Sequence, residues 1–269
     1  IRLISTCHSV ENMEVQSYNY KGINYLKSRV KLFLQKKLYL KHDKVIAVSN
    51  EVKLYLNSIG CFNVTTIYNG INFDTFPNLQ TRKMNPSTIN ICQIGHVIPL
   101  KNQMFSLKLV NYLKKYNLNI KIHFFGSLSK DIDYVKSLKE KIKEFNIEDN
   151  VVFYEHLAFD KLYHYLNDMN IILMPSLSEG MPLSLLEAMY FKLAAIVSNK
   201  GGMKEVISNN KNGLVIKINN DKDFCRIHEY IKCEKYINDG RINRKLVLES
   251  FCSKIMVERY QEEYLKLLL

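Results

Sequence analysis

The chain has 269 residues, of which 47% are hydrophobic and 24% are charged, a composition typical of a folded protein with one large domain or two small ones. Lysine and arginine (38) exceed aspartate and glutamate (26) by 12, so the surface suits an anionic partner: nucleic acid, an anionic membrane face or a phosphorylated substrate. No apolar run approaches the roughly 20 residues of a membrane-spanning helix. The six scattered cysteines include no CxxC pair, which argues against a zinc ribbon or a thioredoxin-type site.

The first part of the chain predicts a short α/β unit. Residues 1–7 have a strand pattern, and because the chain begins at Ile1 with no turn before this strand, we expect it to be cut from a longer protein. The pattern continues with a basic amphipathic helix over 22–42, a strand over 44–48, a helix over 51–59 and a strand over 64–68 that ends at the turn signal Asn69-Gly70.

The second part alternates apolar strands with helical segments. The polar stretch 77–86, with a proline at each end, predicts the linker to it. We expect strands over 89–94, 120–125, 151–154, 171–174 and 193–197, and helices over 104–112, 134–145 and 183–191. Such alternation predicts a parallel sheet covered on both faces. The expected domains are an N-terminal unit over 1–84, a second unit over 85–251, and a last helix over 252–269 that belongs to the second unit or packs back on the first.

Candidate ligand-binding residues follow the predicted strands of the second unit, at the edge where an open α/β sheet binds its ligands. They are Gly95, His96 and Lys101 after the first strand, Gly126 after the second, Glu155 and His156 after the third, and the stretch 175–182 after the fourth. Polar, glycine-rich turns are common in any α/β protein, so no single loop is decisive. Their coincidence at one end of the sheet predicts a ligand crevice.

The segment SEGMPLSLLEAM is the most informative part of the sequence. Pro182 suits the first turn of a helix, and the apolar residues after it indicate that this helix is buried. Glu187 lies within the helix, where a lone carboxylate is costly without a fixed partner. Its partner is either a neighbouring loop, in a structural role, or two hydroxyl groups of a ligand. The backbone N–H groups of Gly180, Met181 and Leu183 are free at the helix start and suit a sugar hydroxyl or a phosphate oxygen.

Three stretches of the chain resemble glycosyltransferase family 4. Glu179, seven residues and Glu187 resemble its E-x7-E motif, and PSLSEGMPLSLLEAM is similar to its usual PSxxEGxGxxxLEAM. GGMKEVISNNKNGLVI is similar to its GGxxEVIxxGxxGxLV stretch, and IYNGINFDTF to its hinge signature xxNGxDxxxF. The spacing of two glutamates alone is a weak signal, but the whole series in order is specific and runs from about His8 to the end of the chain. The resemblance implies an α/β, GT-B-like fold: two Rossmann-type domains with parallel sheets facing a cleft, with the N-terminal, acceptor-side domain incomplete.

The resemblance also implies roles for individual residues. Glu187 would hold the ribose hydroxyls of a nucleoside-diphosphate sugar, and Glu179 would face the donor sugar together with the N–H groups of residues 180–183. Lys101 would neutralise the diphosphate leaving group, where charge grows in the transition state. His8 would contact the donor sugar from the end of the first strand. Family members usually have arginine, in GRxxxxK, where this sequence has His96, in GHVIPLK, so we expect less positive charge at the diphosphate.

The implied reaction is transfer of a hexose from a UDP-, GDP- or ADP-sugar to a hydroxyl of a glycan or lipid-linked acceptor, with retention, in polysaccharide or glycolipid assembly. The resemblance implies no metal and no cofactor besides the donor, and no protein nucleophile. Asp131-Ile132-Asp133 is interpreted as a helix start rather than a metal motif. Cys225, His228 and Cys233 have the residue types of a metal site, but no fourth metal ligand is in view. The expected location is the cytoplasm, with peripheral contact at the inner membrane face left open.

Alternatives remain open at this point. Two observations favour a truncated or degenerate module that binds a nucleotide sugar without transferring it. His96 stands where the family usually has arginine, and a complete first domain would add roughly 100 residues. A second rival is an epimerase or phosphorylase of the same fold, although no pyridoxal-phosphate lysine site is recognisable. The basic helix over 22–42 either lies on an anionic membrane surface or is packed with a solvated basic face. No helix-turn-helix, zinc finger or RNP-like string indicates a nucleic-acid partner.

Overall fold

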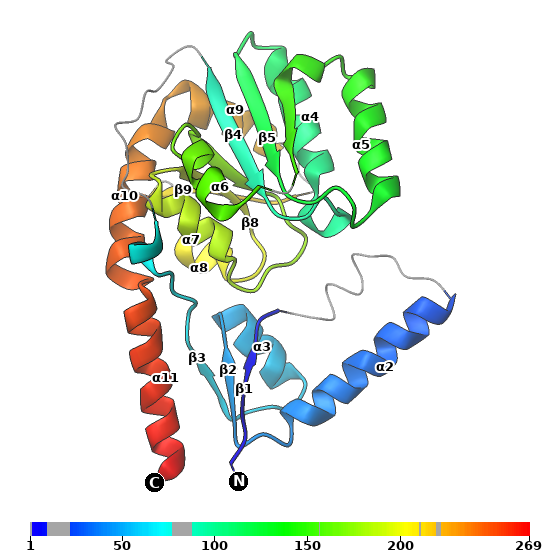
Figure 1. Ribbon diagram of the computed structural model, residues 1–269. Coiled ribbons are helices and arrows are strands. Elements are labelled where there is room, and N and C mark those ends of the chain that lie inside the picture. Colours follow the sequence, from blue (N-terminus) through cyan, green and yellow to red (C-terminus); the bar gives the residue numbers. More distant parts are fainter. Residues whose placement is uncertain (1, 10–21, 77–87, 156, 210, 219–221) are drawn as a thin grey trace.

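The computed structural model describes residues 2–9, 22–76, 88–155, 157–209, 211–218 and 222–269. The chain forms two α/β units, one above the other in Figure 1, and crosses between them within residues 67–76 and again at 251–253. The two crossings are bonded to each other. The N–H of Ile71 donates to the carbonyl of Phe251, and the N–H of Ser253 donates to that of Ile71, both at 2.9 Å.

The first unit is a three-stranded parallel sheet in the order β1 (Ile4–Cys7), β2 (Lys44–Ala47) and β3 (Val64–Thr66). Helix α2 (Gly22–Tyr39) lies between β1 and β2 in the chain, and α3 (Asn50–Ser58) lies between β2 and β3. The central strand is apolar and fully buried at Val45, Ile46 and Ala47. A sheet this small needs further cover for its apolar faces, and part of that cover comes from the last helix of the chain.

The second unit is a six-stranded parallel sheet in the order β6-β5-β4-β7-β8-β9. Its strands are β4 (Ile89–Ile94), β5 (Ile120–Phe125), β6 (Val151–Tyr154), β7 (Ile171–Met174), β8 (Ala194–Ser198) and β9 (Gly213–Ile216). From β4 the chain builds outward through β5 and β6, then returns to the other side of β4 at β7. In open parallel sheets, ligands bind outside the carboxyl ends of the strands where the order reverses, which here is between β4 and β7.

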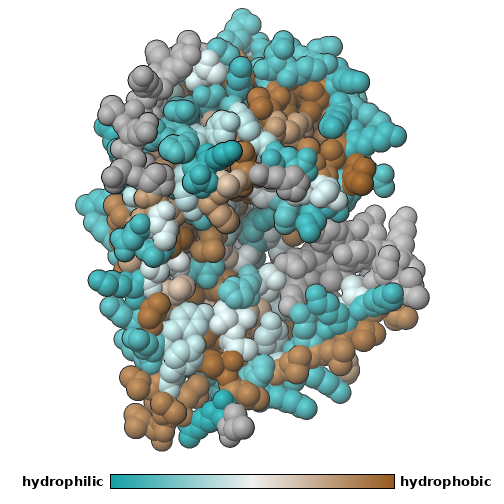
Figure 2. Space-filling model, in the orientation of Figure 1, coloured by the Kyte–Doolittle hydropathy of each residue, from teal (hydrophilic) through white to brown (hydrophobic). Residues whose placement is uncertain are grey.

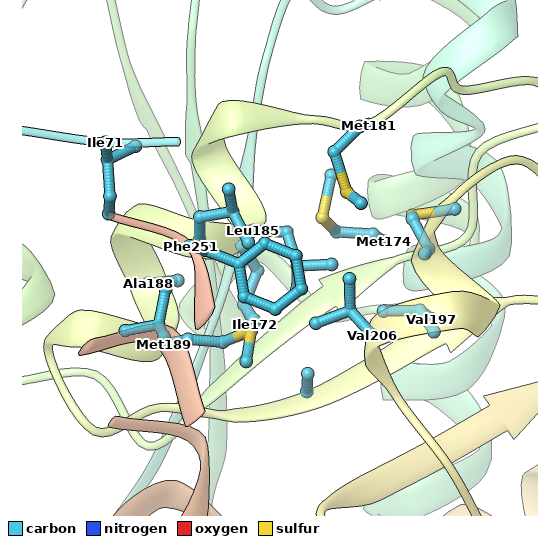
Figure 3. Packing of buried hydrophobic residues seen from close by; sticks show 14 of the residues in the cluster. Ile71, Ile172, Met174, Met181, Leu185, Ala188, Met189, Val197, Val206 and Phe251 are labelled. Carbon is cyan, nitrogen blue, oxygen red and sulfur yellow. The ribbon is translucent and has the colours of Figure 1, made fainter. Parts of the chain in front are cut away.

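Helices cover both faces of this sheet (Figure 1). They are α4 (Gln103–Lys114), α5 (Ile132–Glu144), α6 (Phe159–Leu166), α7 (Leu183–Tyr190), α8 (Met203–Val206), α9 (Lys222–Lys232) and α10 (Lys235–Ser250). Two buried apolar clusters hold the helices to the sheet, and the one under α7 continues into the first unit. Figure 3 shows Ile71 and Phe251, from the two crossings, beside Leu185 of α7. The connection between the units is therefore part of the core.

The last helix, α11 (Ser253–Leu268), lies against the sheet of the first unit (Figure 1). The hydroxyl of Tyr260 is 3.1 Å from that of Thr6, and the buried carboxylate of Glu263 forms an ion pair with Lys44 at 2.9 Å. Burial by itself disfavours the charged form of Glu263, but the ammonium groups of Lys266 and Lys44 hold its pKa below the ordinary value. The helix that ends the chain thus completes the first unit from the far end of the sequence.

The five strands predicted for the second unit and the two later strands of the first are confirmed within one or two residues at their ends. The opening strand begins at Ile4 rather than at residue 1. β9 and the helices α6, α8, α9 and α10 were not predicted, although α6 carries apolar residues at regular helical spacing, Phe159, Leu162, Tyr163 and Leu166. The predicted linker over 77–86 and the domain boundary at 84–85 lie outside the described residues.

Candidate functional site

The carboxyl ends of the two sheets meet at the junction between the units. β1 ends at Cys7 and is followed by His8, whose carbonyl oxygen lies against Gly180 of the second unit. A Cβ built on Gly180 would be only 1.8 Å from that oxygen, so only glycine allows this approach. The side-chain amide of Asn69, which follows β3, donates to the carbonyl of Met181 at 2.7 Å. The loop that contains Glu179 is therefore held between both sheets.

Lys101 and Glu179 form an ion pair at the point where the strand order reverses. Lys101 is on the turn after β4, Glu179 is on the loop after β7, and Nζ lies 2.6 Å from Oε1. The side chains are 21% and 9% exposed, so solvent screens the pair less than a surface pair. The loops touch as well, because the N–H of Leu177 donates to the carbonyl of Leu100 at 2.8 Å. A fixed cation and a fixed carboxylate thus share the position where a ligand is expected.

A buried polar network fixes the backbone around Lys101. Gln93, on β4, donates from Nε2 to the carbonyl of Lys101 at 2.6 Å and accepts from the hydroxyl of Ser106 at 2.7 Å. Gln103 donates from Nε2 to the carbonyl of His96 at 3.0 Å. Because these amides orient main-chain groups, the turn from His96 to Lys101 is pre-organised without a ligand. The imidazole of His96 itself is exposed.

Gly95 and Gly126 bring the loops after β4 and β5 into direct contact. A Cβ on Gly126, at φ +156°, would lie 2.1 Å from the carbonyl oxygen of Gly95. The next loop along the sheet joins them, since the carboxylate of Glu155 accepts from the N–H of Leu128 at 3.1 Å. His156, predicted beside Glu155, lies outside the described residues. Gly95 also lies beside the side chain of Lys101, since a Cβ on Gly95 would be 3.3 Å from Cε of Lys101.

The helix start predicted as a binding group is present. α7 begins at Leu183, the first residue of the predicted helix, and Pro182 is its N-cap residue rather than part of its first turn. Within the part of the chain that the structure describes, the N–H groups of Gly180, Met181 and Leu183 donate no hydrogen bond. The carbonyl of Gly180 accepts from the N–H of Gly202 at 2.6 Å. Three free donors at a helix N-terminus suit an anion or a hydroxyl.

Glu187 is half-buried on α7 and, among the described residues, its carboxylate has no hydrogen-bond or ion-pair partner. Burial raises the pKa of this carboxyl above its ordinary value. The predicted burial of its helix is confirmed at Leu185 and Met189, but it is wrong at Leu183, which is 47% exposed. Leu183 is exposed because the first turn of α7 emerges beyond the carboxyl edge of the sheet. The ligand interpretation of Glu187 therefore keeps its physical basis, an unsatisfied carboxylate.

The remaining sequence candidates fall on both sides of the junction. His8 is exposed and belongs to the first unit, while all the other candidates belong to the second. Among residues that the sequence did not single out, Asn69 contacts the Glu179 loop, and the buried hydroxyl of Ser178 has no partner in the described structure. Tyr68 and Glu205 meet across the junction with an oxygen–oxygen distance of 2.9 Å. Both lie in the stretches that resemble glycosyltransferase family 4, but no local pattern indicates that they touch.

No group of three or more histidine, cysteine or acidic side chains with metal-site geometry occurs among the described residues. Cys225 instead bonds to the hydroxyl of Tyr112 at 3.1 Å, and His228 stacks on Tyr116. Asp131 caps α5 by accepting from the N–H of Tyr134, so its interpretation as a helix start is confirmed. The helices in the described parts of the chain are too short or too polar to cross a membrane.

The fold, the facing sheet edges and the matched sequence define the protein class. The model of glycosyl transferases group 1 matches residues 79–243, more than half of the chain, and that of Glycosyltransferase Family 4 matches residues 1–75. The chain belongs to the glycosyl transferases group 1 family and has a GT-B fold. Two solved structures share this fold at 17% identity, each covering 98% of this chain. They are sucrose-phosphate synthase of Thermosynechococcus elongatus (TM-score 0.82, 67% of that chain) and Anabaena HepE in complex with UDP-glucose (0.80, 72%).

Curated relatives include enzymes of polysaccharide assembly. CapH, a capsular polysaccharide biosynthesis glycosyltransferase of Staphylococcus aureus, is 32% identical over 159 residues, which are 58% of this chain and 42% of that protein. A UDP-Gal:alpha-D-GlcNAc-diphosphoundecaprenol alpha-1,3-galactosyltransferase of Escherichia coli is 22% identical over 284 residues, 97% of this chain and 69% of that protein. The chain spans between 42% and 50% of the length of the first three curated relatives that it matches.

Proposed function

We propose that this chain is the donor-binding part of a retaining glycosyltransferase that transfers a hexose from a nucleoside-diphosphate sugar to an acceptor hydroxyl, in polysaccharide or glycolipid assembly. The observation that carries the proposal is the Lys101–Glu179 pair at the reversal between β4 and β7. A cation and a carboxylate 2.6 Å apart match a ligand with an anionic diphosphate joined to a neutral, hydroxyl-rich sugar. Family membership and the names of the relatives support the same class.

Lys101 serves the leaving group in this proposal. Negative charge on the diphosphate grows as the glycosidic bond breaks, so a fixed ammonium group stabilises the transition state more than the ground state. The buried amides of Gln93 and Gln103 hold the turn, which limits the reorganisation needed when the donor arrives. No protein nucleophile is assigned; the donor phosphate receives the acceptor proton, and no metal is required.

Glu179 and Glu187 hold the neutral parts of the donor. When the diphosphate occupies Lys101, the carboxylate of Glu179 is released to accept hydrogen bonds from sugar hydroxyls, with the N–H groups of Gly180, Met181 and Leu183 beside it. Glu187 accepts from the two ribose hydroxyls, which gives its half-buried charge the partners that it does not have among the described residues. His8 contacts the sugar from the first unit. The loops at Gly95, His96 and Gly126 border the nucleotide.

The second candidate function is nucleotide-sugar binding without transfer. It is favoured by His96, because a neutral imidazole stands where the resembled motif has a guanidinium, and Lys101 is already paired. A site with one cation binds a diphosphate less tightly than a site with two. Turnover, rather than binding, distinguishes this candidate from the transferase.

The deciding experiment is calorimetric titration of the chain with UDP, GDP and ADP, followed by transfer assays with the sugars of the base that binds. We expect micromolar affinity for one nucleotide, and loss of that affinity in Glu187→Ala and Lys101→Ala proteins that melt like the parent chain. UDP is tested first because it is named in the relatives. Equal affinity in the parent and both variants would eliminate the site, and binding without turnover by a chain joined to a complete acceptor domain would select the second candidate.

We also propose that α2 rests on an anionic membrane surface. Its described face exposes a row of apolar side chains at helical spacing, Leu26, Val30, Phe33, Leu34 and Leu38. Exposed lysine and arginine residues flank the row, and the helix contains no aspartate or glutamate. Figure 2 shows the row as a hydrophobic strip beside hydrophilic residues along the lower edge of α2. Apolar area combined with positive charge fits acidic lipid headgroups, and a lipid-linked acceptor would lie at such a surface.

Vesicle flotation tests this contact. The chain should float with vesicles that contain acidic phospholipid and stay behind with neutral ones, and binding should weaken as salt rises. Phe33→Ser with Leu34→Ser, or Lys27→Gln with Lys31→Gln, should reduce flotation at least fivefold. The control is Lys136→Gln with Lys139→Gln on the exposed side of α5, which removes the same number of charges and should change flotation little. Equal flotation of all three double variants would rule out α2 as the contact.

A further inference from the structure

Glu205 belongs to the second unit, yet the groups that donate hydrogen bonds to its carboxylate, among the described residues, all belong to the first. It lies on α8, and both of its oxygens reach across the junction. Oε2 accepts from the N–H of Asn50 at 3.0 Å and from the hydroxyl of Tyr68 at 2.9 Å, and Oε1 accepts from the N–H of Glu51 at 3.1 Å. Among the described residues, this is the side chain that makes the most hydrogen bonds between the units.

The two N–H groups that Glu205 accepts from are the first two of α3. The first turn of a helix has N–H groups without intrahelical partners, and a carboxylate there also interacts favourably with the helix dipole. The helix has its own cap, Ser49, whose hydroxyl accepts from the N–H of Val52 at 3.3 Å. Ser49 thus satisfies the third residue of α3 while Glu205 satisfies the first two. The cap of α3 is complete only when the second unit is in place.

Neighbouring groups keep the contact in one arrangement. Burial, and then the charge and hydrogen bond of Glu205, raise the pKa of Tyr68 to about 12, so its hydroxyl remains a donor at neutral pH. Asn50 donates from Nδ2 to that hydroxyl and accepts from the hydroxyl of Thr66, both at 2.9 Å. Lys204 forms an ion pair with Glu51 at the rim. The end of β3, the start of α3 and helix α8 therefore form one network.

This network is directly joined to the Glu179 loop. α8 starts after Gly201 and Gly202, and a Cβ on Gly201 would lie 2.0 Å from the carbonyl oxygen of Glu179. The N–H of Gly202 bonds to the carbonyl of Gly180, and a Cβ on Gly202 would lie 2.8 Å from the Cβ of Ser49. The start of α8 is thus packed between the Glu179 loop and the cap of α3. A shift of α8 relative to α3 would therefore also displace the Glu179 loop, which contacts His8 through Gly180.

We propose that Glu205 is a positioning residue that holds the two units closed by capping α3 across the junction, and so keeps the Glu179 loop against His8. The expected effect of Glu205 on sugar transfer rests on the proposed function, whereas its expected effect on the junction between the units does not. The groups assigned to the nucleotide, Lys101 and Glu187, lie in the second unit alone. Contact with the sugar from both sides requires the closed arrangement. Loss of Glu205 should therefore spare nucleotide binding and impair transfer.

The structural test compares Glu205→Ala and Glu205→Gln with Glu249→Ala, which removes an exposed carboxylate from α10. In Glu205→Ala, hydrogen exchange at the amides of Asn50 and Glu51 should accelerate at least tenfold. The distance between spin labels at Leu54 and Lys139, exposed on α3 and α5, should shift to longer values. Glu205→Gln keeps an acceptor oxygen and should fall between the parent and the alanine variant. Parent-like exchange and distances in Glu205→Ala would overturn the proposal.

The functional test measures UDP affinity and transfer in the same variants. We expect UDP affinity within twofold of the parent, kcat lowered roughly tenfold in Glu205→Ala, and partial recovery in Glu205→Gln. Equal loss of UDP affinity and kcat would mean that Glu205 acts on the nucleotide site and would overturn positioning. If the parent chain neither binds nucleotide nor transfers sugar, the proposed function fails, while the exchange and distance measurements still decide whether Glu205 closes the junction.

Discussion

Lys101 and Glu179, 78 positions apart in the chain, lie with Nζ and Oε1 2.6 Å apart at the carboxyl ends of β4 and β7. The strand order reverses between these strands, so the pair occupies the position where this fold class binds its ligands. Each charge of the pair is the partner of the other. In the proposed function, a diphosphate that approaches Lys101 competes with Glu179, and the carboxylate of Glu179 becomes available to a sugar only after the diphosphate has replaced it at Lys101. The proposed function therefore implies that binding of the diphosphate and binding of the sugar are coupled through this pair.

This coupling predicts opposite effects of two substitutions on nucleotide affinity. Lys101→Gln should weaken UDP binding by about 10- to 100-fold, the range expected for loss of a charged hydrogen bond. Glu179→Gln should leave UDP binding unchanged or make it several-fold tighter, because the ammonium group no longer has a competing anion. Calorimetric titration measures both, with Lys139→Gln on α5 as the charge control. Weaker binding in Glu179→Gln would show that the carboxylate assists the diphosphate rather than competing with it.

Glu187→Gln should make the empty protein more stable and its binding weaker. Burial raises the pKa of Glu187 in the folded state, so the folded protein takes up this proton more readily than the unfolded chain. The free energy of unfolding therefore falls as pH rises from the ordinary carboxyl pKa through the raised one. The glutamine side chain does not ionise, so the variant does not lose this stability. At pH 7 the melting temperature should increase while UDP affinity decreases at least tenfold. Thermal unfolding at pH 5, 6 and 7 with matched titrations tests this, and a lower melting temperature in Glu187→Gln would contradict it.

His123 should make stability depend on pH between about 6.5 and 4. It is buried on β5 with Nε2 3.2 Å from Oδ1 of Asn90, and burial together with the charge of Lys121 lowers its pKa from 6.5 to about 4. In this window the unfolded chain binds the proton and the folded protein does not, so stability is lost as pH falls, by at most about 1.4 kcal/mol per pH unit. His123→Gln should flatten the profile in urea unfolding, whereas His164→Gln, exposed on α6, should not. If stability still falls steeply with pH in His123→Gln, the pH dependence comes from other groups.

Gly180→Ala should push the two units apart. A Cβ there would lie 1.8 Å from the carbonyl oxygen of His8, which is backbone and cannot rotate away. Overpacking of this kind costs about 1–3 kcal/mol, and separation of the units is the available relief. Small-angle scattering should detect a larger radius of gyration. Gly126→Ala is the comparison, because its clash, 2.1 Å from the carbonyl oxygen of Gly95, lies within the second unit. An unchanged radius in Gly180→Ala would mean that the junction adjusts locally.

Most of the sheet could be predicted because its information is local. Runs such as 171–174 and 193–197 are continuously apolar, and this pattern is characteristic of strands covered on both faces. β9 was not predicted. It begins at a glycine that contacts β8, since a Cβ on Gly213 would lie 2.3 Å from the carbonyl oxygen of Ala195. That requirement comes from the neighbouring strand, which the local sequence does not contain.

The sequence by itself singled out the residues to which the proposed function assigns chemistry: the ammonium group after the first strand of the second unit, and the two carboxylates around the start of α7. It also determined the parallel sheet, through the alternation of apolar runs and helical segments. Only the tertiary structure decided that Lys101 meets Glu179, that Glu205 caps α3 and that α11 returns to the first unit. The physical reason is that these contacts join groups far apart in the chain. Their energy depends on distance and burial in the folded state, which no spacing within a single stretch encodes.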